Sequence, residues 1–176
     1  TDKRPKILVF ILTADRGLCG AFNSNVIREA KRWADEQRST RDAFIEAIYI
    51  GSKAYNALKT DIPTEFAPVP VDAHPTLRHS NLQSAYAIRS FLDGRQDEVW
   101  VLGNQFVSTM VYKTLALRIF PLTVPEIADK TSMPGELIIE PDAAQLLTAV
   151  ARQVANLAIF KAELNSVASE HAARMI

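Results

Sequence analysis

KILVFILTADRGLCGAFNSN, residues 6–25, is an apolar stretch followed by a glycine-bearing turn and the start of a helix. Ile7–Leu12 is continuously apolar, which is typical of a strand buried on both faces of a parallel sheet. The turn Ala14–Gly20 comes next, and a helix is predicted from about Asn23 to Gln37, with Asn23 or Ser24 as its N-cap. A buried strand, a turn and a helix in this order predict an α/β fold.

Strands and helices continue to alternate along the chain. Further strands are predicted at Phe44–Ile50, Glu65–Val71, Val99–Leu102 and Val107–Leu122, and further helices at Ser52–Leu58 and Ser80–Leu92. Pro68 and Pro70 place the Glu65–Val71 strand at a sheet edge. Pro125–Gly135 is predicted to be a polar loop. The pattern indicates an open, mostly parallel sheet flanked by helices, a three-layer Rossmann-like arrangement.

The last part of the chain predicts one long helix, because no proline or glycine occurs from Asp142 to Ile176. Apolar residues recur there at a three-four spacing that is typical of a coiled coil: Leu147, Val150, Val154, Leu157, Leu164, Ala168 and Met175. Lys161 and His171 interrupt this seam. Polar residues at such positions either fix register and partner or mark where the seam leaves its partner.

The length of this helix predicts that it projects from the domain. Roughly 35 residues would reach on the order of 50 Å, whereas a compact domain of this size is about 40 Å across. We therefore divide the chain into a globular unit, residues 1–141, and a coiled-coil helix, residues 142–176. We expect the chain to be a piece of a longer protein whose projecting helix pairs with a second one. Alone, it should self-associate or fray through the Val150–Met175 seam.

Composition excludes several classes of protein. Lys plus Arg and Asp plus Glu number 20 each, so no net field recruits nucleic acid or an anionic membrane. No apolar run approaches the length of a membrane span, and the N-terminus does not resemble a signal peptide. A single cysteine cannot form an internal disulfide, which fits a reducing compartment. These features predict a soluble intracellular protein.

The candidates for chemistry are few. The Asp15–Gly20 turn lies where open α/β sheets often bind phosphate, but its glycines match neither GxGxxG nor a P-loop, and Asp15 would repel an anion unless Arg16 neutralised it. A structural turn held by Asp15 and Arg16 is the favoured alternative. Cys19 has no predictable histidine or base beside it, which favours a small buried side chain over a nucleophile. His74 and His79 lack the partners that a metal site needs.

Two motifs together carry a family resemblance. TADRGLCGAFNSN (residues 13–25) resembles the signature that follows the first strand of the globular domain in the γ subunit of the rotary proton-translocating ATP synthase. SEHAARMI (residues 169–176) resembles the start of that family's second signature, on its C-terminal helix, and IEPDAAQLL (residues 139–147) resembles the passage between them. The motifs are in the family's order, and the resemblance spans essentially the whole chain. The family's first helix and the tip of its C-terminal helix have no counterpart here.

The resemblance implies a non-catalytic central-stalk subunit. In that family two helices form an antiparallel coiled coil inside the ring of α and β subunits, and the globular domain contacts the ε subunit and the membrane c ring. Rotation of the c ring is thereby coupled to ATP synthesis. The resemblance implies a peripheral location at the cytoplasmic face of an energy-transducing membrane, with no membrane insertion of its own. It implies no cofactor, no metal and no nucleic-acid partner.

The family's functional positions are carried over by matching residues. The turn signature comprises Asp15, Arg16, Gly17, Leu18, Cys19, Gly20, Asn23 and Asn25. The stretch facing ε and the c ring comprises Leu137, Ile138, Ile139 and Glu140. The coiled-coil base comprises Ser169, Glu170, Ala172, Ala173, Arg174 and Met175. Two alternatives stay open: a small nucleotide-binding enzyme that uses the Asp15–Gly20 turn, and an unrelated coiled-coil adaptor.

Overall fold

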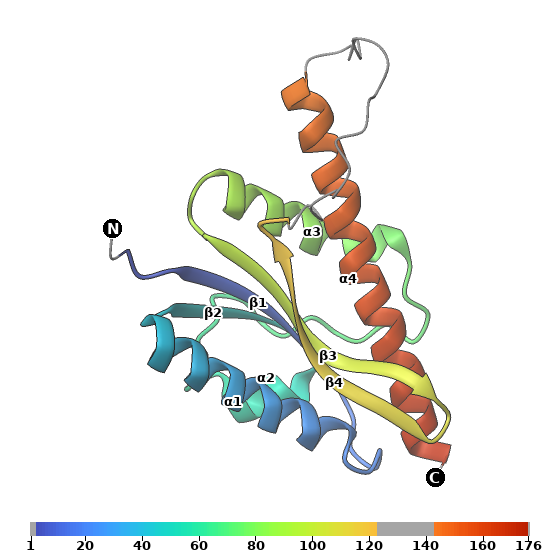
Figure 1. Cartoon of the computed structure of the whole chain (residues 1–176). Helices are drawn as coiled ribbons and strands as arrows, with labels where there is room; N and C mark the ends of the chain where they lie inside the picture. Colours follow the sequence, from blue (N-terminus) through green and yellow to red (C-terminus); the bar gives the residue numbers. More distant parts are fainter. Residues whose placement is uncertain (1–2, 123–142, 176) are drawn as a thin grey trace, which may run out of the picture.

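A computed structural model describes residues 3–122 and 143–175 of the chain. The strands are β1 (Lys6–Leu12), β2 (Phe44–Ile50), β3 (Glu98–Ser108) and β4 (Val111–Phe120). The helices are α1 (Phe22–Arg41), α2 (Ser52–Leu58), α3 (Leu77–Leu92) and α4 (Ala143–Met175). These elements form one four-stranded sheet with helices on both faces (Figure 1).

The sheet has the order β2-β1-β3-β4, and its first three strands are parallel. Phe10 at the middle of β1 lies opposite Ile48 on one side and Val101 on the other. β4 returns antiparallel to β3 as a hairpin. The predicted fold class, an open and mostly parallel sheet between helical layers, is confirmed.

Side chains of β1 alternate between two hydrophobic cores, as the period of a strand requires. Ile7, Val9 and Ile11 pack with α1 and α2, around Trp33 and Leu58. The residues between them, Leu8, Phe10 and Leu12, point to the opposite face and pack with α3 and α4. A strand buried on both faces must be apolar at every position, which explains the unbroken apolar sequence of β1.

Three local predictions differ from the structure. Residues 65–71 form no strand, and only Val69 bridges to the edge strand at Ile50, because the prolines interrupt the ladder. The strand predicted from Val107 begins at Val111, since the preceding residues extend β3. The N-cap of α1 is Ala21, with no side-chain cap, and the Asn23 side chain serves the turn instead.

The prediction that the last helix projects clear of the domain is wrong for most of its length. Only its first turns extend beyond the domain in Figure 1. From Ala155 onward α4 packs across α3 and the sheet, and it buries a stripe of mainly small and polar side chains: Ala155, Asn156, Ile159, Glu163, Ser166, Ser169 and Ala172. α4 therefore helps to build the core.

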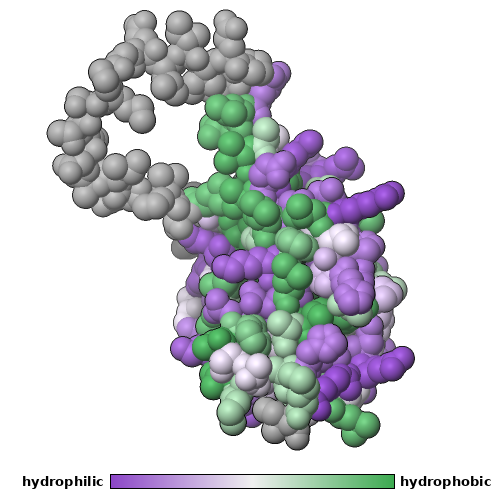
Figure 2. Space-filling view, turned by 90° about the vertical axis from the view of Figure 1, so that its right-hand side faces the viewer, coloured by the Kyte–Doolittle hydropathy of each residue, from purple (hydrophilic) through white to green (hydrophobic). Residues whose placement is uncertain are grey.

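Most of the predicted apolar seam lies on the other face of α4 and is exposed, whereas Val154 and Ala168 are half-buried. Leu147, Leu157 and Met175 keep 69%, 53% and 74% of their surface accessible, and Val150 and Leu164 are also exposed. Leu157 and the buried Ile159 are two positions apart and therefore point about 200° apart around the helix. Figure 2, which views the molecule from the side of α4, shows apolar side chains in a band along it. The helix thus has two stripes on opposite faces, a covered one of mainly small and polar side chains and an exposed apolar one.

The predicted boundary at residue 141 and the predicted stretches at residues 125–135 and 137–140 lie outside the described residues. In the structure, α4 begins at Ala143.

Candidate functional site

The turn after β1 is held together by the side chain of Asn23. Its Oδ1 accepts a hydrogen bond from the backbone N–H of Ala14 at 2.9 Å. Its Nδ2 donates to the carbonyl oxygen of Arg16 at 3.2 Å, and it lies 3.4 Å from the sulfur of Cys19. One amide therefore satisfies both a donor at the end of the strand and an acceptor at the tip of the turn.

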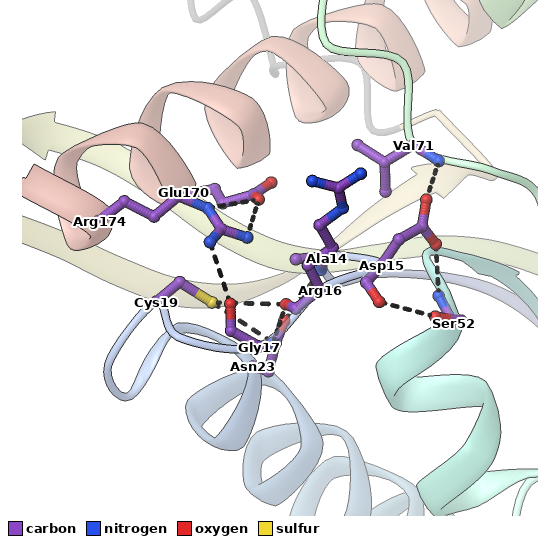
Figure 3. Close-up of polar contacts among 10 residues, drawn as sticks. All are labelled: Ala14, Asp15, Arg16, Gly17, Cys19, Asn23, Ser52, Val71, Glu170 and Arg174. Atoms are coloured by element: carbon purple, nitrogen blue, oxygen red, sulfur yellow. Dashed lines mark hydrogen bonds and ion pairs between the residues drawn. The ribbon is translucent and has the colours of Figure 1, made fainter.

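Asp15 attaches the same turn to the rest of the domain. Its carboxylate accepts hydrogen bonds from the backbone N–H groups of Ser52 and Val71, both at 2.9 Å, and Ser52 Oγ donates back to the Asp15 carbonyl oxygen at 3.1 Å (Figure 3). Among the described residues Asp15 makes no ion pair with Arg16. Asp15 therefore holds the predicted structural turn through backbone amides of α2 and of the segment that follows it, and Arg16 contributes its carbonyl oxygen, which accepts from Asn23.

The tip of the turn uses a left-handed backbone twice. Gly20 has φ +57°, as glycine readily does, but Leu18 also has φ +61° and its side chain is 98% exposed. A non-glycine residue in this region is uncommon and persists where surrounding contacts fix the backbone. The contacts of Asn23 and Asp15 provide that fixation, so the turn presents Leu18 on a rigid support.

Cys19 is a buried structural residue in this turn. It is 1% exposed and packs with Ala14 and Phe22, against Tyr112 and Ala173. Burial raises the pKa of the Cys19 thiol, although Arg174 opposes the shift. A thiol with a raised pKa is a poor nucleophile. The interpretation of Cys19 as a small buried side chain is thereby favoured.

The end of α4 closes over the turn. Arg174 forms an ion pair with Glu170 at 2.8 Å, one helical turn earlier, and its Nη1 donates a 3.0 Å hydrogen bond to the carbonyl oxygen of Gly17 (Figure 3). Ala172 is buried and Ala173 packs against the Cys19 cluster, where a longer side chain would separate the two segments. Ser169 is fully buried, and its hydroxyl has no hydrogen-bond partner among the described residues. Met175 is exposed.

The structure therefore brings two of the three predicted groups of residues into contact. The turn residues and the base residues of α4 form one junction, although they stand at opposite ends of the sequence. Asn25 lies beside it on α1, where its Oδ1 accepts a hydrogen bond from Arg28 at 2.8 Å. The third group, Leu137, Ile138, Ile139 and Glu140, lies outside the described residues.

Sequence reasoning missed the part of the junction that comes from the β3–β4 hairpin. Asn104 is buried, donates to the carbonyl oxygen of Phe22 at 3.0 Å and accepts from Thr114 at 2.7 Å. The ring of Tyr112 lies edge-on to that of Phe22 at 6.1 Å. A buried asparagine within a strand was the available signal, because such a residue needs nearby hydrogen-bond partners.

His74, which precedes α3, and His79, in the first turn of α3, form no metal cluster. His79 pairs with Asp72 at 2.7 Å at an exposed position, and no group of metal-binding side chains occurs in residues 3–122 and 143–175. Within the same ranges, no helix combines the length and apolar character needed to span a bilayer.

Comparison with known proteins shows to which family this chain belongs. The family model described as ATP synthase matches residues 1–176. The ATP synthase gamma chain of Geotalea daltonii is 36% identical over 172 residues, covering 97% of this chain and 58% of the relative. The gamma chain of Fusobacterium nucleatum is 30% identical over 171 residues, covering 96% and 57%. The chain belongs to the ATP synthase gamma-subunit family.

Chains of solved ATP synthase structures share the fold. A chain of the Tetrahymena thermophila mitochondrial ATP synthase central stalk and c ring matches with a TM-score of 0.72 at 24% identity, covering 98% of this chain and 74% of that one. A chain of the Euglena gracilis mitochondrial ATP synthase rotor matches with a TM-score of 0.63 at 18% identity, covering 98% and 64%. The present gamma-family chain spans a little over half the length of its curated relatives.

Proposed function

We propose that this chain is the foot, and part of the shaft, of an ATP synthase central stalk. In this role it couples rotation of the membrane c ring to ATP synthesis or hydrolysis in the α and β subunits. Membership of the gamma-subunit family supports the proposal, as does the similarity to chains of an ATP synthase central stalk and of an ATP synthase rotor.

The exposed seam of α4 is the observation that carries the proposal. A helix that lies on a domain needs only one buried stripe, and α4 already has one, of mainly small and polar side chains, facing α3 and the sheet. The second stripe, from Leu147 to Met175, repeats at coiled-coil spacing and faces outward. Its occupant is a further helix of the whole protein, and the two together enter the ring of α and β subunits.

The other partners follow from the family's positions. The ε subunit and the c ring contact the stretch Leu137, Ile138, Ile139 and Glu140, which places the domain peripherally, at the cytoplasmic face of an energy-transducing membrane. Without its partner helix, the chain self-associates through the Val150–Met175 seam, because exposed apolar stripes of this length favour association.

The role is structural and not catalytic. Polar groups of the turn are engaged by the protein itself: Asp15 accepts from the first residue of α2, and the N–H of Phe22 at the start of α1 donates to the carbonyl oxygen of Cys19 at 3.2 Å. A phosphate would therefore have to displace a carboxylate from the amide at one helix start. This arrangement disfavours the nucleotide-binding alternative. ATP chemistry then belongs to other subunits of the complex.

Calorimetric titration with the ε subunit of the same source tests the foot assignment. We expect saturable one-to-one binding, and a variant with Ile138→Asp and Ile139→Asp should lose it. Leu18→Asp is the matched control, because it adds a carboxylate at a fully exposed position of the turn. Equal binding by the wild type and the double variant would show that ε does not bind at residues 137–140. A well-folded chain with no heat of binding would contradict the foot assignment.

A further inference from the structure

A cavity of about 460 Å³ lies where β1 and β2 end, between α3, α4 and residues 69–75. Leu12 and Thr13 line it from the end of β1, and Ile50 lines it from the end of β2. In open α/β sheets, ligands bind in the crevice outside the carboxyl ends of the strands. The turn and junction described above lie beside this cavity and do not fill it.

Glu163 of α4 is the main polar group of the cavity. It is 9% exposed, and its Oε2 accepts a 2.9 Å hydrogen bond from the hydroxyl of Ser80 on α3. Its Oε1 accepts no hydrogen bond from the described residues and is not among their buried unpaired atoms, so it is open to the cavity. A donor group of a ligand in the cavity can therefore reach this oxygen of a largely buried carboxylate.

Gln83 supplies a second unused acceptor in the same wall. Its Oε1 is buried and has no hydrogen-bond partner in the described part of the chain. Buried acceptors of this kind are rare in folded proteins and call for an explanation. Gln83 and Ser80 lie on α3 and Glu163 faces them from α4, so both acceptors belong to the interface between these helices.

The charge of the lining favours a cation. Its titratable residues are Asp72, His79 and Glu163, and no lysine or arginine lines the described wall. Asp72 is already engaged, because it pairs with His79 and accepts a 2.9 Å hydrogen bond from the backbone N–H of His74. The remaining wall is largely apolar, with valines at positions 69, 71 and 167. An apolar cavity with a few convergent acceptors suits a ligand with an apolar body and one cationic donor group.

We propose that this cavity binds a small organic cation, an alkylammonium group on an apolar body, with Glu163 and Gln83 accepting its N–H donors. This site lies outside the stalk contacts proposed above and does not depend on them. The ammonium donates to the open oxygen of Glu163 and to the unpaired oxygen of Gln83, and the alkyl body covers the valine wall.

Binding should depend on pH through Glu163. Burial raises the pKa of its carboxyl above the ordinary value, the Ser80 hydrogen bond and His79 lower it in part, and Asp72 raises it further. An ammonium group binds the ionised carboxylate, so affinity increases as pH rises through the pKa of Glu163 and binding releases a proton.

Calorimetry on the 176-residue chain tests the proposal, with n-pentylammonium as the probe and 1-pentanol and pentanoate as its neutral and anionic counterparts. We expect saturable binding of pentylammonium at pH 7.5 and roughly tenfold or greater weakening by Glu163→Gln, because a charged hydrogen bond is lost. Glu36→Gln, on the exposed face of α1, is the matched control and should leave affinity unchanged. Heteronuclear NMR should place the largest shifts at Val69 and Val167.

Three results would overturn the cation site: pentanol binding as tightly as pentylammonium, unchanged affinity in Glu163→Gln, or no saturable binding. If Glu163→Gln failed to fold, Gln83→Leu would decide. It removes an acceptor that the fold leaves unpaired, so it should preserve stability while weakening pentylammonium binding.

Discussion

The guanidinium of Arg174 donates a 3.0 Å hydrogen bond to the carbonyl oxygen of Gly17, although the two residues are 157 positions apart. The same guanidinium is oriented by Glu170 at 2.8 Å. This contact joins the turn after β1 to the end of α4. The end of α4 is therefore connected to the sheet through the turn as well as through the core.

Arg174→Lys should loosen the turn without unfolding the domain. A lysine ammonium lacks the planar fork that lets arginine pair with Glu170 and reach Gly17 at once. Hydrogen exchange should therefore accelerate at the amides of residues 17–20, while exchange in β1 stays unchanged. Arg152→Lys, at an exposed position on the same helix, is the control. Unaltered hydrogen exchange at residues 17–20 of Arg174→Lys would show that the hydrogen bond from Arg174 to Gly17 does not stabilise the turn.

Asn23→Ala should destabilise the whole domain. It leaves the N–H of the buried Ala14 without its acceptor, and an unsatisfied buried donor costs about 1–3 kcal/mol. Ser24→Ala removes an exposed hydroxyl at the next position and should change stability by less than about 0.5 kcal/mol. Urea unfolding measures both values. Equal stability of the two variants would contradict the role given to the Asn23 amide.

Much of the fold was predictable because β1 and β2 are buried along most of both faces. These two strands match their predicted ranges closely, since a parallel strand between two helical layers is mostly apolar. The strand predicted over residues 65–71 failed because alternating apolar residues occur there without a usable ladder. For α4, only the apolar stripe was visible in the sequence. The buried stripe contains alanine, serine, asparagine and glutamate, which in sequence resemble a solvated face.

Gly51 and Gly20 should respond differently to alanine. Both have positive φ, but a Cβ on Gly51 would lie 2.1 Å from the carbonyl oxygen of Thr13, whereas one on Gly20 meets nothing within 4 Å. Gly20→Ala should cost about 1–2 kcal/mol from backbone strain alone. Gly51→Ala adds a clash with backbone and should cost more than about 3 kcal/mol. Thermal and urea unfolding test the difference, and equal costs would contradict the close approach.

The stabilising contribution of Glu98 should be lost in acid, so the domain should be less stable at low pH than at pH 7. Burial alone would raise the pKa of its carboxyl, but hydrogen bonds from Arg41 and Trp100 hold that pKa below the ordinary value. A carboxyl with a lowered pKa in the folded state stabilises the fold above its unfolded pKa, about 4.3. That contribution is lost as pH falls through the folded pKa.

Unfolding free energies between pH 3 and pH 7 measure this effect. Glu98→Gln should be less stable than the wild type at pH 7, and the two should converge toward pH 3. Glu36→Gln, at an exposed position, should follow the wild-type curve throughout. Parallel curves for wild type and Glu98→Gln would contradict the lowered pKa.

The residues of the junction could be predicted from the sequence, but the contacts between them could not. Both signatures were visible, yet nothing in the sequence places residue 17 against residue 174, because that contact depends on how α4 crosses the sheet. Asn23 matched the pattern of a helix cap, and its side chain proved to serve the preceding strand and turn. One of the Asp15 contacts is with the segment near Val71. The path of this irregular segment could not be predicted, because no helical or strand periodicity of its sequence specifies it.

The central claim is that the outward stripe of α4 is one half of a coiled coil. Its most direct test is a sedimentation-equilibrium titration of the chain with a peptide of the N-terminal helix of the Geotalea daltonii gamma chain. Wild type, Leu157→Glu and Ala149→Glu are compared, because both variants add one carboxylate at an exposed position of α4 and only the first lies in the seam. We predict a one-to-one complex for wild type and Ala149→Glu, and none for Leu157→Glu. Equal binding by all three, or no binding by the folded wild type, would contradict the claim.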